Sequence, residues 1–352
     1  MADFAAAEAA LLTTKLFIPR PRAGQVSRPE LADRLNRALR LGHQLMVISA
    51  PPGFGKTTLL SEWLSERMKD EGGRRKDTSE DSFLHPTSHI PHPFNVAWLS
   101  LDSGDNDPYR FLAYCLAALQ TVEPAIRIDA RLAGAAEPAS AQALITVLIN
   151  QLARLPGDLV FVLDDFHLIE SPIIHEGLAF LLDNLPASTR LVIASRSGLP
   201  FSVARLRGRG QLTELTAADL RFSPAEAAAF LSQTMGLALA PEDVALLEEK
   251  TEGWIAGLQL AALSLHGRPQ TEASGFVRAF SGSHRHIFDY LLEETLQRQP
   301  PEVQQFLLLT SLPDRLCGPL CDALLAASPV HIVVALRRAT SSASALTRRS
   351  PR

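Results

Sequence analysis

One stretch of the sequence indicates the fold: Leu45-Met46-Val47-Ile48-Ser49-Ala50-Pro51-Pro52-Gly53-Phe54-Gly55-Lys56-Thr57-Thr58. Its first residues form an apolar run typical of a buried strand, and the residues after Thr58 have the spacing of a helix. A strand, a glycine-containing loop and a helix in this order favour phosphate binding, because the loop amides and the helix N-terminus point at the same place. The stretch therefore predicts a nucleotide site.

The loop residues have distinct expected roles. Lys56 would reach the β- and γ-phosphates, the Thr57 hydroxyl would ligate Mg²⁺, and Thr58 would lie beside the α-phosphate. The full set of predicted nucleotide contacts in the loop is Pro52, Gly53, Phe54, Gly55, Lys56, Thr57 and Thr58. Ala50 stands where the strict pattern has glycine. The alternative is therefore an ordinary glycine-containing turn with a surface lysine.

A pair of acids follows a second apolar run. Asp164 and Asp165 come directly after Leu159–Leu163, which has the continuous apolar character of a central parallel strand. Ligand-binding residues of parallel sheets lie at this carboxyl edge. Asp164 is predicted to bind Mg²⁺, and Asp165 to act as a base or to position water near the γ-phosphate. A solvated pair of acids at the start of a loop is the alternative.

Arg196 ends another apolar run, Leu191–Ser195. We expect this run to be a strand of the same sheet, which would bring the guanidinium to the edge that carries the acids. A guanidinium there can sense the γ-phosphate or stabilise charge as it transfers, so Arg196 is the second candidate catalytic residue. The alternative is a salt bridge at a strand end.

Composition narrows the class of protein. The chain has 352 residues, 46% of them apolar, and a formal net charge of −4, which gives no overall electrostatic case for nucleic-acid binding. We find no signal peptide and no apolar run long enough to cross a membrane, and therefore expect a cytoplasmic protein without membrane contact. Strands alternate with helices as far as about residue 218, and only helices follow. This order predicts an α/β fold with a five-stranded, mainly parallel sheet.

Several motifs together resemble a known family. They are Thr14-Lys15-Leu16 with Val26-Ser27-Arg28, the loop at 50–58, Trp98-Leu99-Ser100-Leu101-Asp102 with Asp105-Asn106-Asp107-Pro108, Leu163-Asp164-Asp165-Phe166-His167, Ser195-Arg196, Thr251-Glu252-Gly253-Trp254-Ile255-Ala256-Gly257-Leu258, and Ser281-Gly282-Ser283-His284-Arg285 with Asp289-Tyr290-Leu291. The combination, over about residues 12 to 327, resembles the N-terminal ATPase half of the large ATP-dependent LuxR-type transcriptional activators. That group contains the maltose-regulon activator and falls within the STAND class of P-loop NTPases.

The resemblance implies a domain order. It comprises an N-terminal arm at 1–25, a P-loop ATPase domain at 26–218, a helical domain at 219–266, a winged-helix-like module at 267–327 and a disordered tail at 328–352. In this class of protein the winged-helix-like module regulates the chain internally and does not read DNA.

The resemblance also implies a function. The chain would bind ATP in an active state and ADP in a resting state, with Mg²⁺, and Val26 and Arg28 would line the adenine side. Slow hydrolysis would act as a timer, although the sequence leaves enzymatic activity and ATP-dependent self-association open. We expect DNA contact only through sensor and helix-turn-helix domains that relatives carry and this sequence does not include. A truncated or frameshifted reading frame is the leading explanation for the absence of these domains. The alternative to the switch function is a nucleotide-independent interaction or autoinhibitory fragment.

Overall fold

The computed structural model describes residues 11–21, 24–74, 94–124, 126, 141–155, 157–280, 290, 301–311 and 317–326. The chain divides into two compact units, Met1–Phe280 and Ser281–Arg352, and each is described by itself. The first ten residues of the predicted arm and the predicted tail at 328–352 lie outside the described residues.

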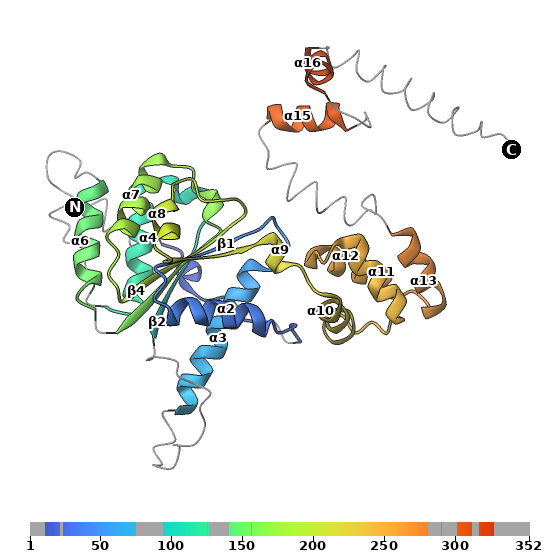
Figure 1. Cartoon of the computed structure of the whole chain (residues 1–352), viewed down its shortest axis with the longest axis horizontal. Coiled ribbons are helices and arrows are strands. Elements are labelled where there is room, and N and C mark those ends of the chain that lie inside the picture. Colours follow the sequence, from blue (N-terminus) through green and yellow to red (C-terminus); the bar gives the residue numbers. More distant parts are fainter. Residues whose placement is uncertain are drawn as a thin grey trace. The chain divides into compact units, whose positions relative to one another are not determined.

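A five-stranded parallel sheet forms the centre of the first unit (Figure 1). Its strands are β1 (Leu45–Ser49), β2 (Phe94–Ser100), β3 (Asp158–Asp164), β4 (Thr189–Ser195) and β5 (Leu212–Thr216). They lie in the order β2-β3-β4-β1-β5, and every neighbouring pair is parallel. The predicted α/β fold with five strands is therefore confirmed. Strand β4 lies between β1 and β3, so it separates the strand before the glycine loop from the strand before the acid pair.

Helices cover both faces of the sheet (Figure 1). One face packs against α2 (Pro29–Arg40) and α3 (Lys56–Arg74), and the other packs against α4 (Pro108–Gln120), α6 (Ala141–Leu152), α7 (Pro172–Asp183) and α8 (Ala204–Gly208). Successive strand residues enter opposite cores: Val47 packs in the core formed with α4, α6, α7 and α8, whereas Met46 and Ile48 pack in the core formed with α2 and α3. Burial on both faces explains the continuous apolar runs in the sequence.

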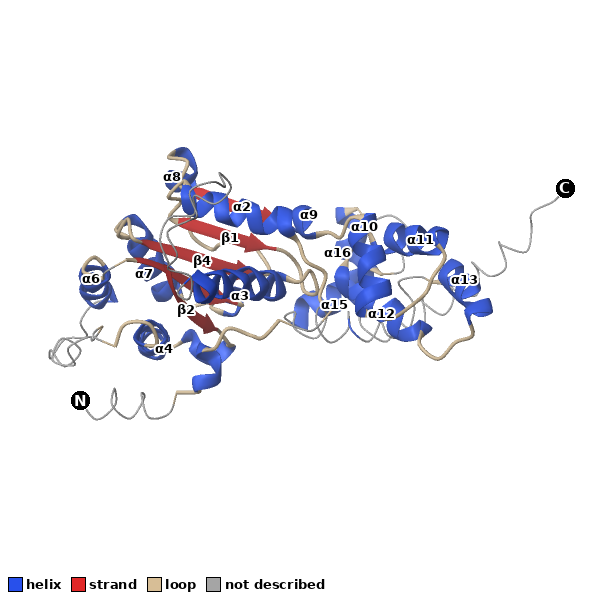
Figure 2. Cartoon of the chain, turned by 90° about the horizontal axis from the view of Figure 1, so that it is seen from below, coloured by secondary structure: helices blue, strands red, loops and turns tan. Residues whose placement is uncertain are grey.

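Short helices complete the first unit. Single 3₁₀ turns occur at Thr13–Leu16, Ser103–Asn106 and Phe166–Leu168. After β5 come α9 (Ala217–Leu220), α10 (Pro224–Ala229), a π-helical turn (Phe230–Thr234), α11 (Pro241–Thr251), α12 (Ile255–Leu265) and α13 (Gln270–Ala279). In Figure 2 the arrowheads of the strands point toward α10 and α12. The helices from α10 to α13, called the helical part below, therefore lie on the side of the carboxyl edge of the sheet.

Helix α13 packs with the helical part, whereas the sequence placed it in the following module, which was predicted to begin at residue 267. Lys250 on α11 donates hydrogen bonds to the carbonyls of Arg278 and Phe280, both at 2.8 Å. Ser274 on α13 donates to the Asp243 carboxylate at 2.6 Å. These bonds fix α13 against α11, so the helical part extends beyond the predicted boundary at 266.

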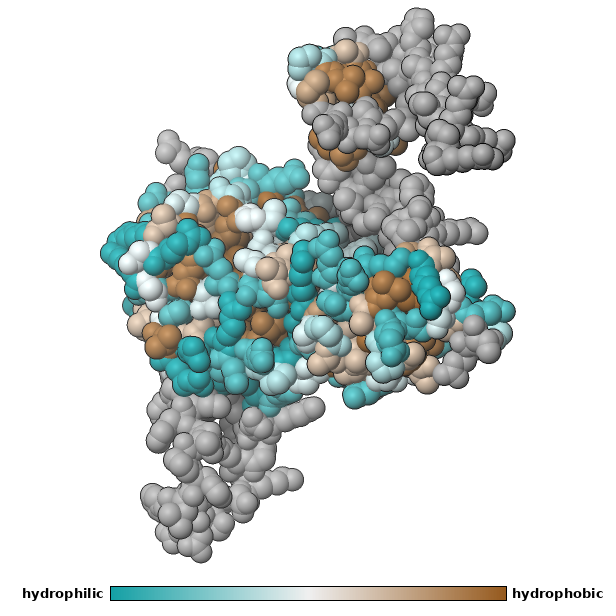
Figure 3. All heavy atoms as spheres, turned by 45° about the vertical axis from the view of Figure 1, so that its right-hand side comes forward, coloured by the Kyte–Doolittle hydropathy of each residue, from teal (hydrophilic) through white to brown (hydrophobic). Residues whose placement is uncertain are grey.

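The second unit contains α15 (Pro301–Thr310) and α16 (Gly318–Ala326), which pack against each other. Val303, Leu307, Leu308 and Leu325 on this helix pair are exposed. Figure 3 shows the hydrophobic atoms gathered on the pair as brown spheres at the upper right. Among the described residues, no helix is both long enough and apolar enough to cross a lipid bilayer.

Candidate functional site

The glycine loop joins β1 to α3, which begins at Lys56. Gly53 and Gly55 have φ angles of 79° and 75°, in the left-handed region that favours glycine. The Lys56 ammonium donates to the carbonyls of Ala50 at 2.7 Å and Pro51 at 3.1 Å, so it lies across the loop. Ala50 is a buried residue at the end of the strand and donates its N–H to the Ser195 carbonyl at 3.2 Å. The structure thus has the strand, the glycine loop and the helix in the order that the sequence predicted.

Thr57 and Asp164 meet at the carboxyl edge of the sheet. The Thr57 hydroxyl donates to the Asp164 carboxylate at 2.8 Å, although 107 residues separate the two positions. Asp164 is 2% exposed, and its pKa is raised to about 6, chiefly by burial and then by the neighbouring Asp165 carboxylate. The two predicted metal ligands are therefore brought together.

Asp165 has an unusual backbone. Its φ of 56° and ψ of 36° place it in the left-handed region, which aspartate enters more readily than most residues. Its side chain is 42% exposed, and the His167 Nδ1 lies 3.8 Å from its carboxylate. Backbone strain of this kind gathers at functional sites. The left-handed conformation turns the chain directly after the metal-ligand candidate Asp164.

The pKa of Lys56 responds to three charged side chains of the site, those of Asp164, Asp165 and Arg196. Burial lowers the pKa of the Lys56 ammonium, the Asp165 and Asp164 carboxylates oppose this shift, and the Arg196 guanidinium adds to it. Arg196 follows β4 and therefore comes between the loop after β1 and the acids after β3. The strand order brings the two predicted catalytic residues to the predicted phosphate-binding loop.

Arg28 contacts the segment that follows β5. Its guanidinium donates to the carbonyls of Leu220 at 2.7 Å and Arg221 at 2.8 Å, and to the Glu226 carboxylate at 2.8 Å. It also lies over the Phe222 ring, 5.1 Å from the centroid. These partners lie at the end of α9, in the segment after it and in α10, so the charged end of Arg28 holds two segments of the protein together.

Val26 is half-buried, and its neighbour Gln25 fixes this segment beside α3. The Gln25 amide donates to the Glu62 carboxylate at 2.9 Å and to the Thr58 carbonyl at 3.5 Å. Thr58 itself is exposed. The segment that carries Val26 thus lies against the first turns of the helix that follows the loop.

Asn106 holds the chain that follows the acid pair. Its side-chain oxygen accepts from the N–H groups of Glu170 at 2.6 Å and Ser171 at 3.0 Å, and its amide donates to the Leu168 carbonyl at 2.8 Å. The preceding Asp105 is fully buried and pairs with the buried Lys15. In the sequence these residues were recognised only as parts of family motifs, and their spacing did not predict their contacts.

The helical part contacts the glycine loop directly. The Trp254 indole N–H donates to the Pro52 carbonyl at 3.0 Å, and the Ala256 N–H donates to the Gly53 carbonyl at 3.1 Å. A Cβ added at Gly55 would lie 3.0 Å from the Ile255 Cδ1. Sequence reasoning missed this contact. The Gly253-Trp254-Ile255-Ala256 motif was the signal for a functional segment, but a motif does not reveal which residues it contacts.

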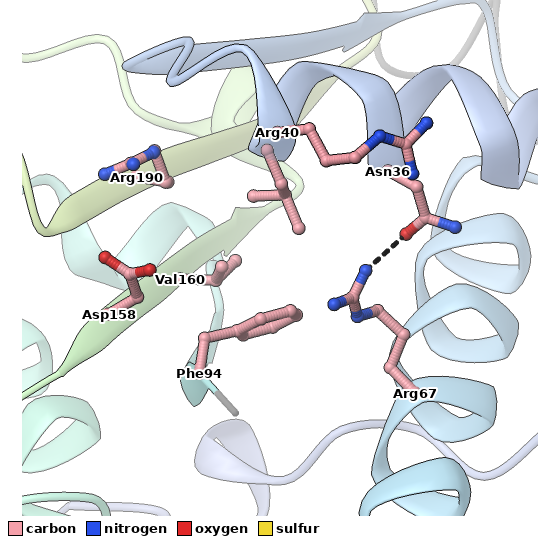
Figure 4. A pocket seen from close by; sticks show the side chains of 8 residues that line it. Asn36, Arg40, Arg67, Phe94, Asp158, Val160 and Arg190 are labelled. Atoms are coloured by element: carbon pink, nitrogen blue, oxygen red, sulfur yellow. Dashed lines mark hydrogen bonds between the residues drawn. The ribbon is translucent and has the colours of Figure 1, made fainter. Parts of the chain in front are cut away.

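A separate pocket lies at the other edge of the sheet (Figure 4). It is lined by Asn36, Leu39, Arg40, Arg67, Phe94, Asp158, Val160 and Arg190. Phe94, Asp158 and Arg190 stand at or near the amino ends of β2, β3 and β4, whereas the glycine loop and the acids follow the carboxyl ends. The pocket is therefore distinct from the candidate nucleotide site.

The strand order, the glycine loop and the acid pair define a class: the chain has the α/β fold of a P-loop NTPase. A solved structure with a similar fold is the Walker-type ATPase PABY2304 of Pyrococcus abyssi, with a TM-score of 0.50. The similarity covers 92% of this chain and 91% of that chain at 13% sequence identity.

Within this class the chain resembles MalT-type transcriptional activators, as its motifs predicted. Residues 292–349 match the MalT winged helix domain. The chain is 29% identical over 314 residues to the HTH-type transcriptional regulator MalT of Vibrio cholerae, covering 89% of this chain and 32% of MalT. It is 35% identical over 309 residues to the serine/threonine-protein kinase PknK of Mycobacterium tuberculosis, covering 86% of this chain and 25% of PknK.

The chain thus spans a quarter to a third of the length of these relatives. The winged-helix match overlaps both the predicted module at 267–327 and the predicted tail at 328–352. The boundary that the sequence placed at 327 falls inside it.

Proposed function

We propose that the chain is a nucleotide-binding switch module of a transcriptional regulator, with ATP and ADP as its ligands and Mg²⁺ as its metal. The observation that carries this proposal is the bond between Thr57 and Asp164 beside the Lys56 ammonium. A hydroxyl and a carboxylate that meet next to a glycine loop form the arrangement that binds a nucleotide-associated Mg²⁺.

The donor set fits the metal. Mg²⁺ prefers oxygen ligands and is commonly bound through one or two protein oxygens together with substrate phosphates. Thr57 and Asp164 supply such oxygens, and the raised pKa of Asp164, about 6, still leaves its carboxylate mostly ionised at neutral pH. The metal, when bound, would neutralise phosphate charge, and Lys56 would contribute a second positive charge at the loop.

Asp165 and Arg196 are proposed to act on the γ-phosphate. Both are close enough to Lys56 to shift its pKa, which supports a position at the phosphate end of the site. Asp165 would position or deprotonate water, and Arg196 would stabilise charge on the transferring group. We propose slow ATP hydrolysis as the timer of the switch. Val26 and Arg28 remain the proposed adenine neighbours, and the Arg28 guanidinium also holds the adjoining segments.

The relatives differ in their named activities, which supports the proposal that this chain acts as a switch module. Corresponding segments occur in a protein described as a kinase and in one described as an HTH-type regulator. A segment that occurs with different outputs is expected to control them and not to perform them. We therefore propose that this segment itself does not read DNA.

Calorimetry with Mg²⁺ and ATP or ADP tests the proposal. The Lys56→Ala variant should lose nucleotide binding, because the loop loses its positive charge at the phosphates. Arg205→Ala is the matched control: it also removes one positive charge, but Arg205 is an exposed residue on α8 that pairs with Asp183. Its affinity should equal that of the unaltered chain.

Thermal unfolding gives a second measurement. At a nucleotide concentration of about 100 times the dissociation constant, binding should stabilise the folded chain by about 3 kcal/mol. A folded chain whose melting temperature does not respond to Mg²⁺ and nucleotide would contradict the proposal. It would favour the nucleotide-independent interaction or autoinhibitory fragment.

A further inference from the structure

The glycine loop is held from outside by two hydrogen bonds. The Pro52 carbonyl accepts from the Trp254 indole, and the Gly53 carbonyl accepts from the Ala256 N–H at the start of α12. More than 200 residues separate the donor Trp254 from its acceptor. Two successive peptide units of the loop are therefore oriented by the helical part.

Planarity of the peptide bond gives these contacts a consequence. In a trans peptide unit, the C=O of one residue and the N–H of the next point in opposite directions. The bond to the Pro52 carbonyl therefore turns the Gly53 N–H away from α12, and the bond to the Gly53 carbonyl does the same for the Phe54 N–H. Among the described residues, neither N–H donates a hydrogen bond to the protein. Both donors thus remain available to an anion.

The position of α12 against the loop is itself fixed. Gly253 has a φ of 69°, and its carbonyl accepts from the Phe222 N–H at 2.9 Å. A Cβ at Gly253 would lie 2.4 Å from the Phe222 carbonyl oxygen, so the two segments are in backbone contact. Ile255 then approaches Gly55 closely. Backbone contacts therefore fix the start of α12 next to the loop.

We propose that Trp254 and the Ala256 N–H are positioning groups for phosphate binding: they orient the N–H groups of Gly53 and Phe54 toward the nucleotide phosphates. The inference rests on the proposed nucleotide-binding function and adds to it the dependence of phosphate affinity on the helical part. A displacement of α12 would release both carbonyls and allow both amides to turn. Phosphate affinity and the placement of the helical part are therefore coupled.

The test compares two tryptophan variants of the full chain. Trp254→Phe removes the indole N–H and keeps an aromatic ring. Trp63→Phe is the matched control, because the Trp63 indole also donates one hydrogen bond, at 2.9 Å to Asn36. The probes are ADP with Mg²⁺ and inorganic pyrophosphate, each measured by calorimetry, and the melting temperature of each nucleotide-free variant is recorded.

The expected result is a loss of affinity of about fivefold in Trp254→Phe, the effect of one net hydrogen bond, and no loss in Trp63→Phe. The factor should be the same for ADP and pyrophosphate, because the two amides act on phosphate. A merely structural role would lower the melting temperature instead and would leave the affinity of the folded fraction unchanged.

Two outcomes would overturn the inference while the proposed function stands. In the first, the unaltered chain binds ADP and Trp254→Phe binds it equally well. In the second, only the melting temperature changes. If the unaltered chain binds neither probe and Lys56→Ala makes no difference, the proposed function fails, and the inference fails with it.

Discussion

The most unusual titratable group of the candidate site is the Asp164 carboxyl. It is 2% exposed, and burial together with the Asp165 charge raises its pKa to about 6. In the unfolded chain an aspartate has a pKa of about 3.9. The folded state therefore binds a proton more tightly than the unfolded state, and protonation of Asp164 stabilises the fold as pH falls from about 7 toward 4. Above pH 6 the fold carries an ionised, buried carboxylate.

Asp164→Asn should therefore stabilise the nucleotide-free chain at pH 7.5, by about 1 to 2 kcal/mol, because the amide keeps an acceptor for Thr57 and carries no charge. At pH 5 the gain should be smaller, since the wild-type carboxyl is then largely protonated. Urea unfolding at the two pH values measures the difference. Asp183→Asn, at a side chain that is 53% exposed, is the control and should show a smaller dependence on pH. An equal gain at both pH values would contradict the argument.

At the scale of elements, the local sequence pattern was sufficient to predict the sheet. It was not sufficient to predict the contacts between distant segments. The strand Leu159–Leu163 was predictable because a strand buried on both faces needs a continuous apolar run. The meeting of Thr57 with Asp164 was predictable because parallel strands bring their carboxyl ends to one edge. The partner of Trp254 was not, because one indole N–H can bond to any nearby carbonyl. For the same reason the charge of Arg28 did not reveal that it bonds to the helical part.

The turn between α11 and α12 leads to a prediction for Gly253→Ala. The φ of 69° is unfavourable for alanine, and its Cβ would lie 2.4 Å from the Phe222 carbonyl oxygen. We expect a loss of unfolding free energy of at least ~2 kcal/mol, together with weaker nucleotide binding as α12 moves from the loop.

Gly267→Ala is the control for this prediction. Gly267 has a φ of 80°, but a Cβ there meets nothing within 4 Å. The strain alone should cost about 1 kcal/mol and leave nucleotide affinity unchanged. Chemical denaturation gives the stabilities. Equal losses in the two variants would show that the contact with Phe222 contributes nothing.

At the scale of the whole first unit, Arg28 joins the N-terminal segment to the helical part. It is 9% exposed and bonds to two carbonyls and to Glu226. Arg28→Ala would leave these acceptors without their donor in a mostly buried place. The expected loss of unfolding free energy is about 2 to 4 kcal/mol.

Arg34→Ala provides the comparison, because the Arg34 side chain is 43% exposed and its ion pair with Asp219 lies at the surface. Its loss should be below about 1 kcal/mol. Differential scanning fluorimetry ranks the two variants, and urea unfolding gives the values. A loss in Arg28→Ala no larger than that in Arg34→Ala would show that the segment is held by other contacts.

The bond from Arg28 to Glu226 closes a loop of 198 residues. During synthesis at about 5 to 20 residues per second, the ribosome needs roughly 10 to 40 s to make that length of chain. Over this interval the Arg28 guanidinium has none of its final partners, which lie at 219–226, although β1 and the glycine loop have already emerged. The order of translation therefore makes the contacts of Arg28 among the last of the P-loop NTPase fold to form.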